Sequence, residues 1–462
     1  MSDTIPTSTE VLVAGAGTGG STAARAAARA GRAVLLVDTG QADEIGHKVC
    51  GNALSRGGLE AVARHIDPPS GAEIAQVLDG GTLLLADGRT SIEVEAPGVV
   101  VNRVLFGQRL LAEAIAEGAQ LIDRCECVSW EERDPPSVRV RRSDGRETVI
   151  RASVVIDATG YRGVLTRVDG PTHHETLTRA DAGIGYREIV PLVEPLPNPR
   201  RGFVALSPKE APGGYAWVFP MGERLANVGI GASLETTGHD LRGALGRLLE
   251  EHAGLSASAP VTAGGGMLPL RRPLASVVGD GFAAVGDAAC QANPLHGEGI
   301  APSIIAGALA GQAAALAVRS GDTRARALWP YAASFMRDVG ASHAAHEVLR
   351  RTVYGLRDDD FDFLCVELGQ SGLMLRTIGA RGPRLPLSAA IGVAGKLARR
   401  PGLFRRLLRV AKLAEEMMET YRAYPEDPDR LQTWIGRVEY NLRTLDHLLG
   451  ARRPAGSPRG AY

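Results

Sequence analysis

A glycine-rich segment near the N-terminus has the residue types and spacing of a phosphate-binding turn. Residues 15–20 read GAGTGG and fit the pattern Gly-x-Gly-x-x-Gly through Gly15, Gly17, Gly19 and Gly20. The first glycine permits a tight turn, the second lets the backbone approach a pyrophosphate, and the last lets helix and strand pack closely. A helix that begins here offers free N–H groups and partial positive charge to phosphates. The segment predicts a dinucleotide site.

The segments around this turn have the texture of a strand, a helix and a second strand. Residues 10–14 and 33–37 are short apolar runs, and the alanine-rich residues 21–30 lie between them. Uninterrupted apolar runs are typical of parallel strands covered on both faces. Asp38 ends the second run, where its carboxylate is placed to bind ribose hydroxyls and to repel a phosphate. The unit therefore favours an NAD or FAD ligand over an NADP-type one.

A second signal far downstream decides between these dinucleotides. Residues 281–285 return to the texture of a short apolar strand, and Asp287 follows, placed to bind a ribityl hydroxyl. Gly297, Gly299 and Ile300 then open a long helix. The N-terminus of that helix can face the flavin edge on which reduction builds negative charge. A nicotinamide enzyme does not need this distant return, so we predict FAD.

These motifs resemble those of the large FAD family that has the p-hydroxybenzoate hydroxylase fold. Residues 157–160 (DATG) resemble its middle motif, and residues 103–110 resemble its R-x-x-F-D-x-x-L helix. Gly107 replaces the usual Asp of that helix, and Thr18 replaces a common Pro in the first loop.

The resemblance implies an α/β fold in which a Rossmann-like FAD-binding domain carries an antiparallel-sheet substrate domain and a C-terminal helical region. It also implies that Arg103 contacts FAD and that the backbone near Cys127 lines the adenine. We place the boundaries as follows: FAD-binding domain 1–162, substrate domain 163–270, return to the FAD-binding domain 271–325, helical region 326–450 and a disordered tail 451–462.

Two further segments narrow the resemblance to the geranylgeranyl reductases. Residues 212–220 (PGGYAWVFP) match the P-x-x-Y-x-W-x-F-P motif of that family at every fixed position. The sequence at Lys48, Cys50 and Gly51 resembles the family's K-x-C-G loop. The resemblance covers roughly residues 8–320. It implies that this loop lies against the flavin.

The aromatic residues of the longer motif can form a wall for an apolar chain. Side chains alternate along a strand, so Tyr215, Trp217 and Phe219 point to the same face. Such a wall suits an isoprenoid chain, which forms no hydrogen bonds and is held by burial and dispersion. The family resemblance implies that this wall, with Pro220 at its end, binds substrate over the flavin. The alternative is a core strand of the second domain.

Saturation of an alkene requires a hydride and a proton, and an isolated alkene accepts hydride poorly without a well-placed acid. The family resemblance implies that Cys50 is the contact near the flavin, where it can donate the proton, relay it, or pack beside the flavin as a small hydrophobe. His47 and His296 lie in candidate flavin loops and are better explained as structural. The sequence contains no second nicotinamide fold, so NAD(P)H at the flavin face or a ferredoxin is the expected electron donor.

We therefore expect an FAD-dependent reductase that saturates C=C bonds of a geranylgeranyl or other polyprenyl chain with a hydride from flavin N5. The substrate would be a prenyl diphosphate or a polyprenyl lipid, such as a geranylgeranylated lipid, a chlorophyll side chain or a menaquinone tail. A flavin-dependent monooxygenase or halogenase on the same fold is the alternative. A third hypothesis is a non-catalytic flavoprotein that binds lipid.

Composition excludes several other classes. Lys plus Arg and Asp plus Glu are balanced at 52 each, which gives no field for a nucleic-acid partner. The five cysteines contain no Cys-x-x-Cys pair, which argues against a structural zinc site and favours a reducing, cytoplasmic setting without a metal. The polar N-terminus lacks the pattern of a signal peptide.

Two helical segments raise the question of membrane contact. Residues 301–318 are weakly polar, and we expect a buried helix rather than a membrane span. Residues 396–412 are basic and amphipathic, and such a helix can lie on the anionic inner face of a membrane. The alternative is a solvated helix packed on the FAD-binding domain.

Overall fold

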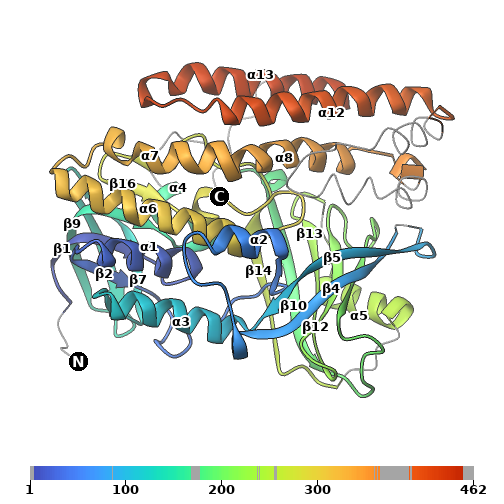
Figure 1. The fold of residues 1–462 in the computed structure, drawn as a ribbon, viewed down its shortest axis with the longest axis horizontal. Coiled ribbons are helices and arrows are strands. Elements are labelled where there is room, and N and C mark those ends of the chain that lie inside the picture. Colours follow the sequence, from blue (N-terminus) through green and yellow to red (C-terminus); the bar gives the residue numbers. More distant parts are fainter. Residues whose placement is uncertain are drawn as a thin grey trace.

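The computed structural model describes residues 5–450 apart from residues 86, 168–176, 237, 239, 254–257, 358, 362, 365–394 and 396–397. The expected tail 451–462 and Lys396 of the basic segment thus lie outside the described residues. Two sheets stand beside each other, and helices from the C-terminal third cover one side of the molecule (Figure 1).

The first sheet is a parallel sheet with a small antiparallel extension, in the order β15-β16-β9-β1-β2-β6. Its parallel strands are β1 (Ser8–Ala14), β2 (Val34–Val37), β6 (Gln120–Ile122), β9 (Glu147–Asp157) and β16 (Phe282–Ala284). The extension adds β15 (Val278–Gly279), β7 (Cys125–Arg133) and β8 (Pro136–Arg142). All four residues of β2 are buried, as expected for a strand covered on both faces.

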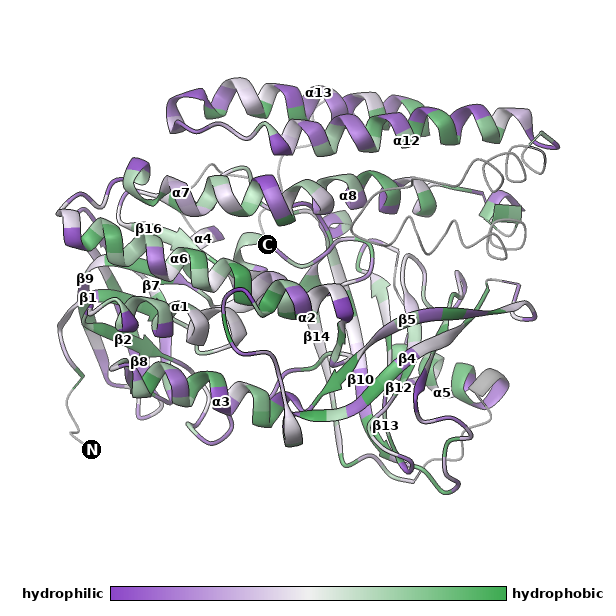
Figure 2. Cartoon of the chain, in the orientation of Figure 1, coloured by the Kyte–Doolittle hydropathy of each residue, from purple (hydrophilic) through white to green (hydrophobic). Residues whose placement is uncertain are grey.

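Close contact between two helices sets the architecture of this domain. Helix α1 (Thr18–Arg29) and helix α6 (Ile300–Ser320) touch through small residues. A Cβ on Gly307 would lie 2.2 Å from the carbonyl oxygen of Gly19, so the two backbones meet there. By length and composition α6 is apolar enough to cross a membrane, but it is mostly buried inside the protein. Figure 2 shows its hydrophobic character, and its burial makes it a core helix.

The second sheet has the order β14-β10-β13-β12-β11-β4-β5-β3. Its strands are β3 (Ala53–Ser55), β4 (Ile74–Leu84), β5 (Ser91–Val101), β10 (Ala182–Pro191), β11 (Arg201–Ala205), β12 (Tyr215–Pro220), β13 (Leu225–Ser233) and β14 (Thr262–Pro269). All of its pairings are antiparallel except that between β4 and β11.

The second sheet contains strands that the expected domain boundaries assign to the FAD-binding domain. Those boundaries assign everything before residue 163 to the FAD-binding domain, but residues 53–55, 74–84 and 91–101 belong to the second sheet. Pairing of β4 with β11 causes the difference, and it requires glycine: a Cβ on Gly81 would lie 2.7 Å from the carbonyl oxygen of Gly202.

Helices dominate the rest of the described chain. Helix α3 (Arg103–Ala116) covers the first domain, α2 (Arg56–Val62) follows β3, and α4 (Val164–Arg167) and α5 (Leu241–Leu248) are short. The C-terminal region contains α7 (Ala325–Phe335), α8 (Ala341–Tyr354), α12 (Pro401–Arg422) and α13 (Leu431–Leu449). A single π-helical turn joins α7 to α8, so the two form one long rod (Figure 1).

Helix α12 turns its apolar side inward. It packs against α8 and α13 and buries Leu403, Val410 and Leu413. Arg405 and Arg409 are exposed on the outer side. The basic segment therefore has the arrangement of a packed helix with a charged outer surface.

Candidate cofactor and substrate site

A cavity of about 510 Å³ lies where the first sheet meets the second. Most of the residues predicted for the site line it: Gly15, Gly17, Gly19, Asp38, Lys48, Cys50, Gly51, Arg103, Cys127, Tyr215, Trp217, Phe219, Asp287, Gly297, Gly299 and Ile300. Gly20 and Pro220 do not line it. The buried Pro220 lies on the other face of its strand, so its predicted substrate contact has no support, and Gly20 acts through packing.

The glycine turn makes room for a ligand at the start of α1. A Cβ on Gly20 would lie 1.8 Å from the carbonyl oxygen of Gly15, which has a positive φ of +102°. Both positions therefore need glycine for close packing. A Cβ on Gly17 would meet nothing within 4 Å, so the space in front of it is open. The first turn of α1 carries no acidic residue, which leaves its N–H groups available to an anion.

Arg103 adds a buried positive charge beside this turn. It is 7% exposed, and its Nη2 donates to Thr18 Oγ1 at 2.8 Å. Its Nε and Nη1 are buried without a hydrogen-bond partner. Buried donors normally have partners, so these two N–H groups are suited to bind a phosphate of the ligand. The hydroxyl that replaces a proline at position 18 thus orients this arginine. The structure also explains why glycine replaces the usual Asp at position 107, because a Cβ there would lie 2.4 Å from Gly46 Cα.

Replacement of Arg103 by glutamine should weaken FAD binding about 10-fold or more, because a hydrogen bond to a charged group contributes about 1.5–3 kcal/mol. Titration of apoprotein with FAD, followed by flavin fluorescence, measures the Kd. The matched control is Arg109→Gln on the same helix, where Arg109 pairs with Glu73 and does not line the cavity. Equal Kd values for Arg103→Gln and wild type would contradict the assignment.

The part of the cavity beside the end of β2 suits an adenosine. Asp38 accepts hydrogen bonds from the backbone N–H groups of Ala16 at 2.6 Å and Gly40 at 2.7 Å, which holds its carboxylate at the end of β2. Burial raises the pKa of Cys127, and burial raises that of Cys125 to about 11. Both thiols are therefore neutral and provide an apolar surface. Together with the open turn and Arg103, this donor set fits the diphosphate and adenosine of FAD.

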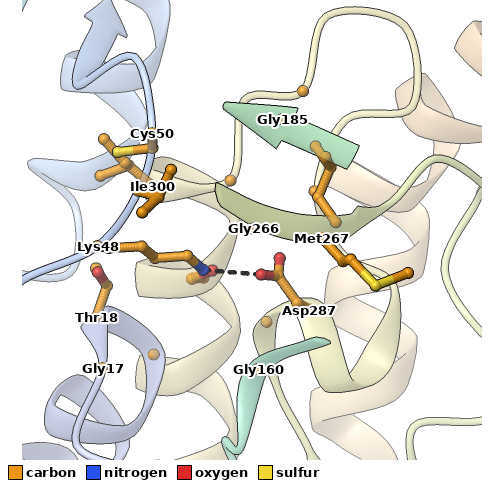
Figure 3. Close-up of a pocket in the computed structure, with 18 of the residues that line it drawn as sticks. Gly17, Thr18, Lys48, Cys50, Gly160, Gly185, Gly266, Met267, Asp287 and Ile300 are labelled. Atoms are coloured by element: carbon orange, nitrogen blue, oxygen red, sulfur yellow. Dashed lines mark hydrogen bonds and ion pairs between the residues drawn. The ribbon is translucent and has the colours of Figure 1, made fainter. Parts of the chain in front are cut away.

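The middle of the cavity holds an ion pair that the sequence did not reveal. Lys48 Nζ lies 2.8 Å from Asp287 Oδ2, and the two side chains point toward each other (Figure 3). The attraction of Asp287 raises the pKa of Lys48. These residues come from segments 239 positions apart. The pair joins the Cys50 loop to the short turn that follows β16.

The predicted aromatic wall exists as a continuous layer. The ring centroids of Tyr215 and Trp217 are 5.9 Å apart, and those of Trp217 and Phe219 are 6.3 Å apart with planes 24° from parallel. The Tyr215 hydroxyl donates to the carbonyl oxygen of His296 at 2.6 Å. Trp217 Nε1 donates to Asn227 Oδ1 at 3.0 Å. Both polar tips are thus satisfied, so the wall presents apolar ring surface to the cavity.

A row of glycines continues this surface across the second sheet. Gly231, Gly185 and Gly266 are cross-strand partners on β13, β10 and β14, and all three line the cavity. A Cβ on them would approach no atom closer than 3.9, 3.6 and 3.7 Å, and none of the three has a positive φ. Neither packing nor backbone conformation requires glycine there. The row therefore forms a trough that leaves space for a ligand.

The Cys50 loop is tied to this wall. Asn227 is fully buried, and its Nδ2 donates to the carbonyl oxygen of Cys50 at 2.9 Å while its Oδ1 binds Trp217. The Cys50 Sγ donates to Asn52 Oδ1 at 2.9 Å. Sequence patterns did not indicate Asn227, since an isolated asparagine in a strand carries no motif. The thiol is consequently held at one place in the cavity.

His47 and His296 both line the cavity, and His296 is not an acid there. Burial lowers the pKa of His296 to about 3, so its ring is neutral at physiological pH. This agrees with a structural role for the residue.

Glu298 lies between Gly297 and Gly299, but it does not itself line the cavity. Its Oε1 is buried without a partner, and Ser55 Oγ donates to its Oε2 at 3.5 Å. Burial raises the pKa of Glu298 to about 7, and the Ser55 hydrogen bond partly opposes this. The folded state therefore holds more protons than the unfolded state below that pH, and stability decreases as the pH rises toward 7.

Glu298→Gln should remove this dependence. We expect its Tm to match wild type at about pH 5, where the folded carboxyl is already protonated, and to exceed it at about pH 8. The difference should be about 2 °C or more in a thermal melt. Glu60→Gln, at an exposed position on α2, is the control, and its Tm should match that of wild type at both pH values. A Tm for Glu298→Gln below wild type at the higher pH would refute the effect of burial.

Fold and site together define an FAD-dependent oxidoreductase. Residues 10–176 match the family model described as FAD dependent oxidoreductase, and residues 181–268 match that described as Geranylgeranyl reductase catalytic domain. The chain belongs to the geranylgeranyl reductase family, whose members act on C=C bonds.

Its relatives span most of its length. Digeranylgeranylglycerophospholipid reductase 1 of Methanopyrus kandleri is 35% identical over 340 residues, which cover 70% of this chain and 84% of the relative. The reductase of that name from Sulfolobus acidocaldarius is 28% identical over 452 residues, covering 95% of this chain and 98% of the relative.

Solved structures agree with this assignment. A geranylgeranyl bacteriochlorophyll reductase-like protein from Thermoplasma acidophilum aligns with a TM-score of 0.73 and 26% identity, covering 87% of this chain and 99% of that protein. A myxobacterial chondrochloren halogenase aligns with a TM-score of 0.59 and 20% identity, covering 81% of this chain and 90% of its own. That likeness shows a shared fold, so the halogenase alternative has no support beyond the fold.

Proposed function

We propose that this enzyme saturates C=C bonds in the geranylgeranyl chains of a membrane glycerophospholipid. The observation that carries the proposal is the cavity that joins the FAD-binding turn to the ring wall of Tyr215, Trp217 and Phe219. The names of the relatives indicate the lipid, and the trough of Gly231, Gly185 and Gly266 offers an apolar chain a path without side chains.

Each group in the cavity has a place in this reaction. Reduced FAD supplies a hydride from its N5 when bound. Arg103 and the start of α1 hold the diphosphate, and Asp38 and Asp287 bind the ribose and ribityl hydroxyls. The ring wall excludes water and orients the chain by burial and dispersion. Cys50 delivers the proton to the alkene carbon that does not receive the hydride.

We propose that NAD(P)H or a ferredoxin reduces the FAD. Anaerobic mixing of the oxidised enzyme with each donor, followed by loss of flavin absorbance, identifies the donor. Fast bleaching with one donor and none with the other decides between them, and no bleaching with either would exclude both.

Lipid mass spectrometry tests the function. We expect cells that make both the chain and a digeranylgeranylglycerophospholipid to accumulate species that gain two hydrogens per reduced bond. Cells with the same lipid and without the chain are the control. If FAD-loaded enzyme with an active donor leaves the lipid unchanged in vitro, the proposed substrate is wrong.

We also propose a cytoplasmic protein that contacts the inner face of the membrane through 396–412. Support comes from the lipid substrate and from Arg405, Arg409 and Lys412, which are exposed on α12. Because the apolar side of α12 is used in packing, the attraction would be mainly electrostatic and weakened by salt. Sedimentation with anionic liposomes at low salt should capture wild type and release a variant with these three residues changed to Glu. Equal capture of both would refute this surface.

A further inference from the structure

Arg187 is a buried cation without a carboxylate partner. It lies on β10, is 8% exposed, and forms no ion pair within the part of the chain that the structure describes. Its Nη1 donates to Thr262 Oγ1 at 2.7 Å, its Nη2 donates to the carbonyl oxygen of Lys48 at 3.0 Å, and its Nε has no partner. Burial of a guanidinium without a counterion destabilises the folded state, so its position in the fold is informative.

That place is beneath the Cys50 loop. The register of the second sheet puts Gly229 and Gly264 on either side of Arg187. A Cβ on Gly264 would lie 3.0 Å from Val49 Cγ2, so the loop rests directly on the sheet there. The arginine thus binds the loop two residues before the thiol.

The charges around Cys50 single out this arginine. Burial lowers the pKa of Arg187, and ionised Cys50 is the charge that opposes this effect. Lys48 also interacts with Cys50, but Asp287 already pairs with it at 2.8 Å. Arg103 is near Lys48 as well, and its Nη2 donates to Thr18 Oγ1 in the phosphate-binding turn at 2.8 Å. Among these cations of the described chain, Arg187 has no carboxylate partner and can stabilise a negative charge on the sulfur.

We propose that Arg187 is a positioning residue that holds the Cys50 loop and stabilises the thiolate left when Cys50 gives its proton to the substrate. The inference rests on the proposed function. In that step the S–H bond breaks and a C–H bond forms, while the hydride of reduced FAD forms the second C–H bond. Water returns the proton to the sulfur, and NAD(P)H or a ferredoxin restores the reduced flavin.

The test measures the thiol itself. Oxidised holoenzyme without lipid is alkylated with iodoacetamide across a range of pH, and mass spectrometry of the Cys50 peptide gives the midpoint of reactivity. For Arg187→Met the midpoint should rise by about one pH unit, because an opposite charge nearby favours a thiolate by about that amount or more. Arg187→Lys keeps the charge and should stay nearer to wild type. An unchanged midpoint in Arg187→Met would overturn the proposal.

Controls separate charge from structure. Arg201→Gln removes a half-buried arginine of the same sheet, which donates to the carbonyl oxygens of Gly81 and Val94, and should leave the midpoint unchanged. Arg187→Gln serves as the second neutral variant, and whichever neutral variant retains FAD and wild-type circular dichroism is used. Because no prenyl substrate is present, a shifted midpoint supports Arg187 even if the lipid reaction fails. A midpoint that rises equally in Arg187→Lys would contradict the role of charge.

Discussion

Cys50→Ala is expected to slow prenyl reduction by about 10²–10⁴-fold, the usual contribution of a general acid, while FAD remains bound. The reason is that an isolated alkene accepts hydride poorly unless a proton arrives at the other carbon. Cys50 lines the cavity, and its sulfur is held by Asn52 at 2.9 Å. Single-turnover reoxidation of the reduced enzyme by lipid, measured anaerobically through flavin absorbance, isolates this step.

Two variants make that result specific. Cys50→Ser keeps a donor of weaker acidity and should fall between alanine and wild type. Cys290→Ala removes a fully buried thiol that does not line the cavity, and we expect wild-type turnover. If Cys50→Ala reoxidises at the wild-type rate with full FAD content, the proton comes from another group, and Cys50 packs beside the flavin.

Gly185→Val should nearly abolish turnover of long prenyl chains without destabilising the protein. The added side chain would project into the trough, because its Cβ would approach no protein atom closer than 3.6 Å. Glycine within a strand costs roughly 0.5–1 kcal/mol relative to alanine, so the substitution should leave the Tm unchanged or raise it. Steady-state kinetics with lipids of different chain length, together with thermal melts, tests both parts.

A neighbouring glycine provides the matched comparison. Gly229 lies on the same sheet, but a Cβ there would lie 2.2 Å from Trp217 Cζ2. Gly229→Ala should therefore lower the Tm by displacing the ring wall, whereas Gly185→Ala should fold normally and reduce activity less than Gly185→Val. Wild-type kinetics in Gly185→Val would show that the chain takes another path through the cavity.

The sequence predicted those parts of the site that depend on local geometry. The glycine turn, Asp38 and Asp287 all follow apolar strand patterns, and the carboxyl ends of parallel strands meet at one edge of a sheet. Sequence patterns a few residues long were therefore enough to predict that these residues line one cavity. The same is true of the common face of Tyr215 and Phe219, which strand alternation determines.

Contacts between distant segments were not accessible in this way. Pairing of β4 with β11 joins residues more than a hundred positions apart and brings three strands, β3, β4 and β5, into the second sheet. The glycine row also depends on contacts between distant segments, because Gly231 and Gly266 come together only through their register with β10. A glycine in a sequence does not reveal what its absent side chain would face.

The sequence by itself determined the cofactor class, the family resemblance and the aromatic wall, since each depends on residue types at short, regular spacing. Tertiary structure decided what surrounds the thiol: Asn227 on the carbonyl of Cys50, Arg187 beneath the loop, and the pairing of Lys48 with Asp287. The physical reason is that hydrogen bonds and charges act over a few ångströms in space, and only the packing of the two sheets brings these residues within that range.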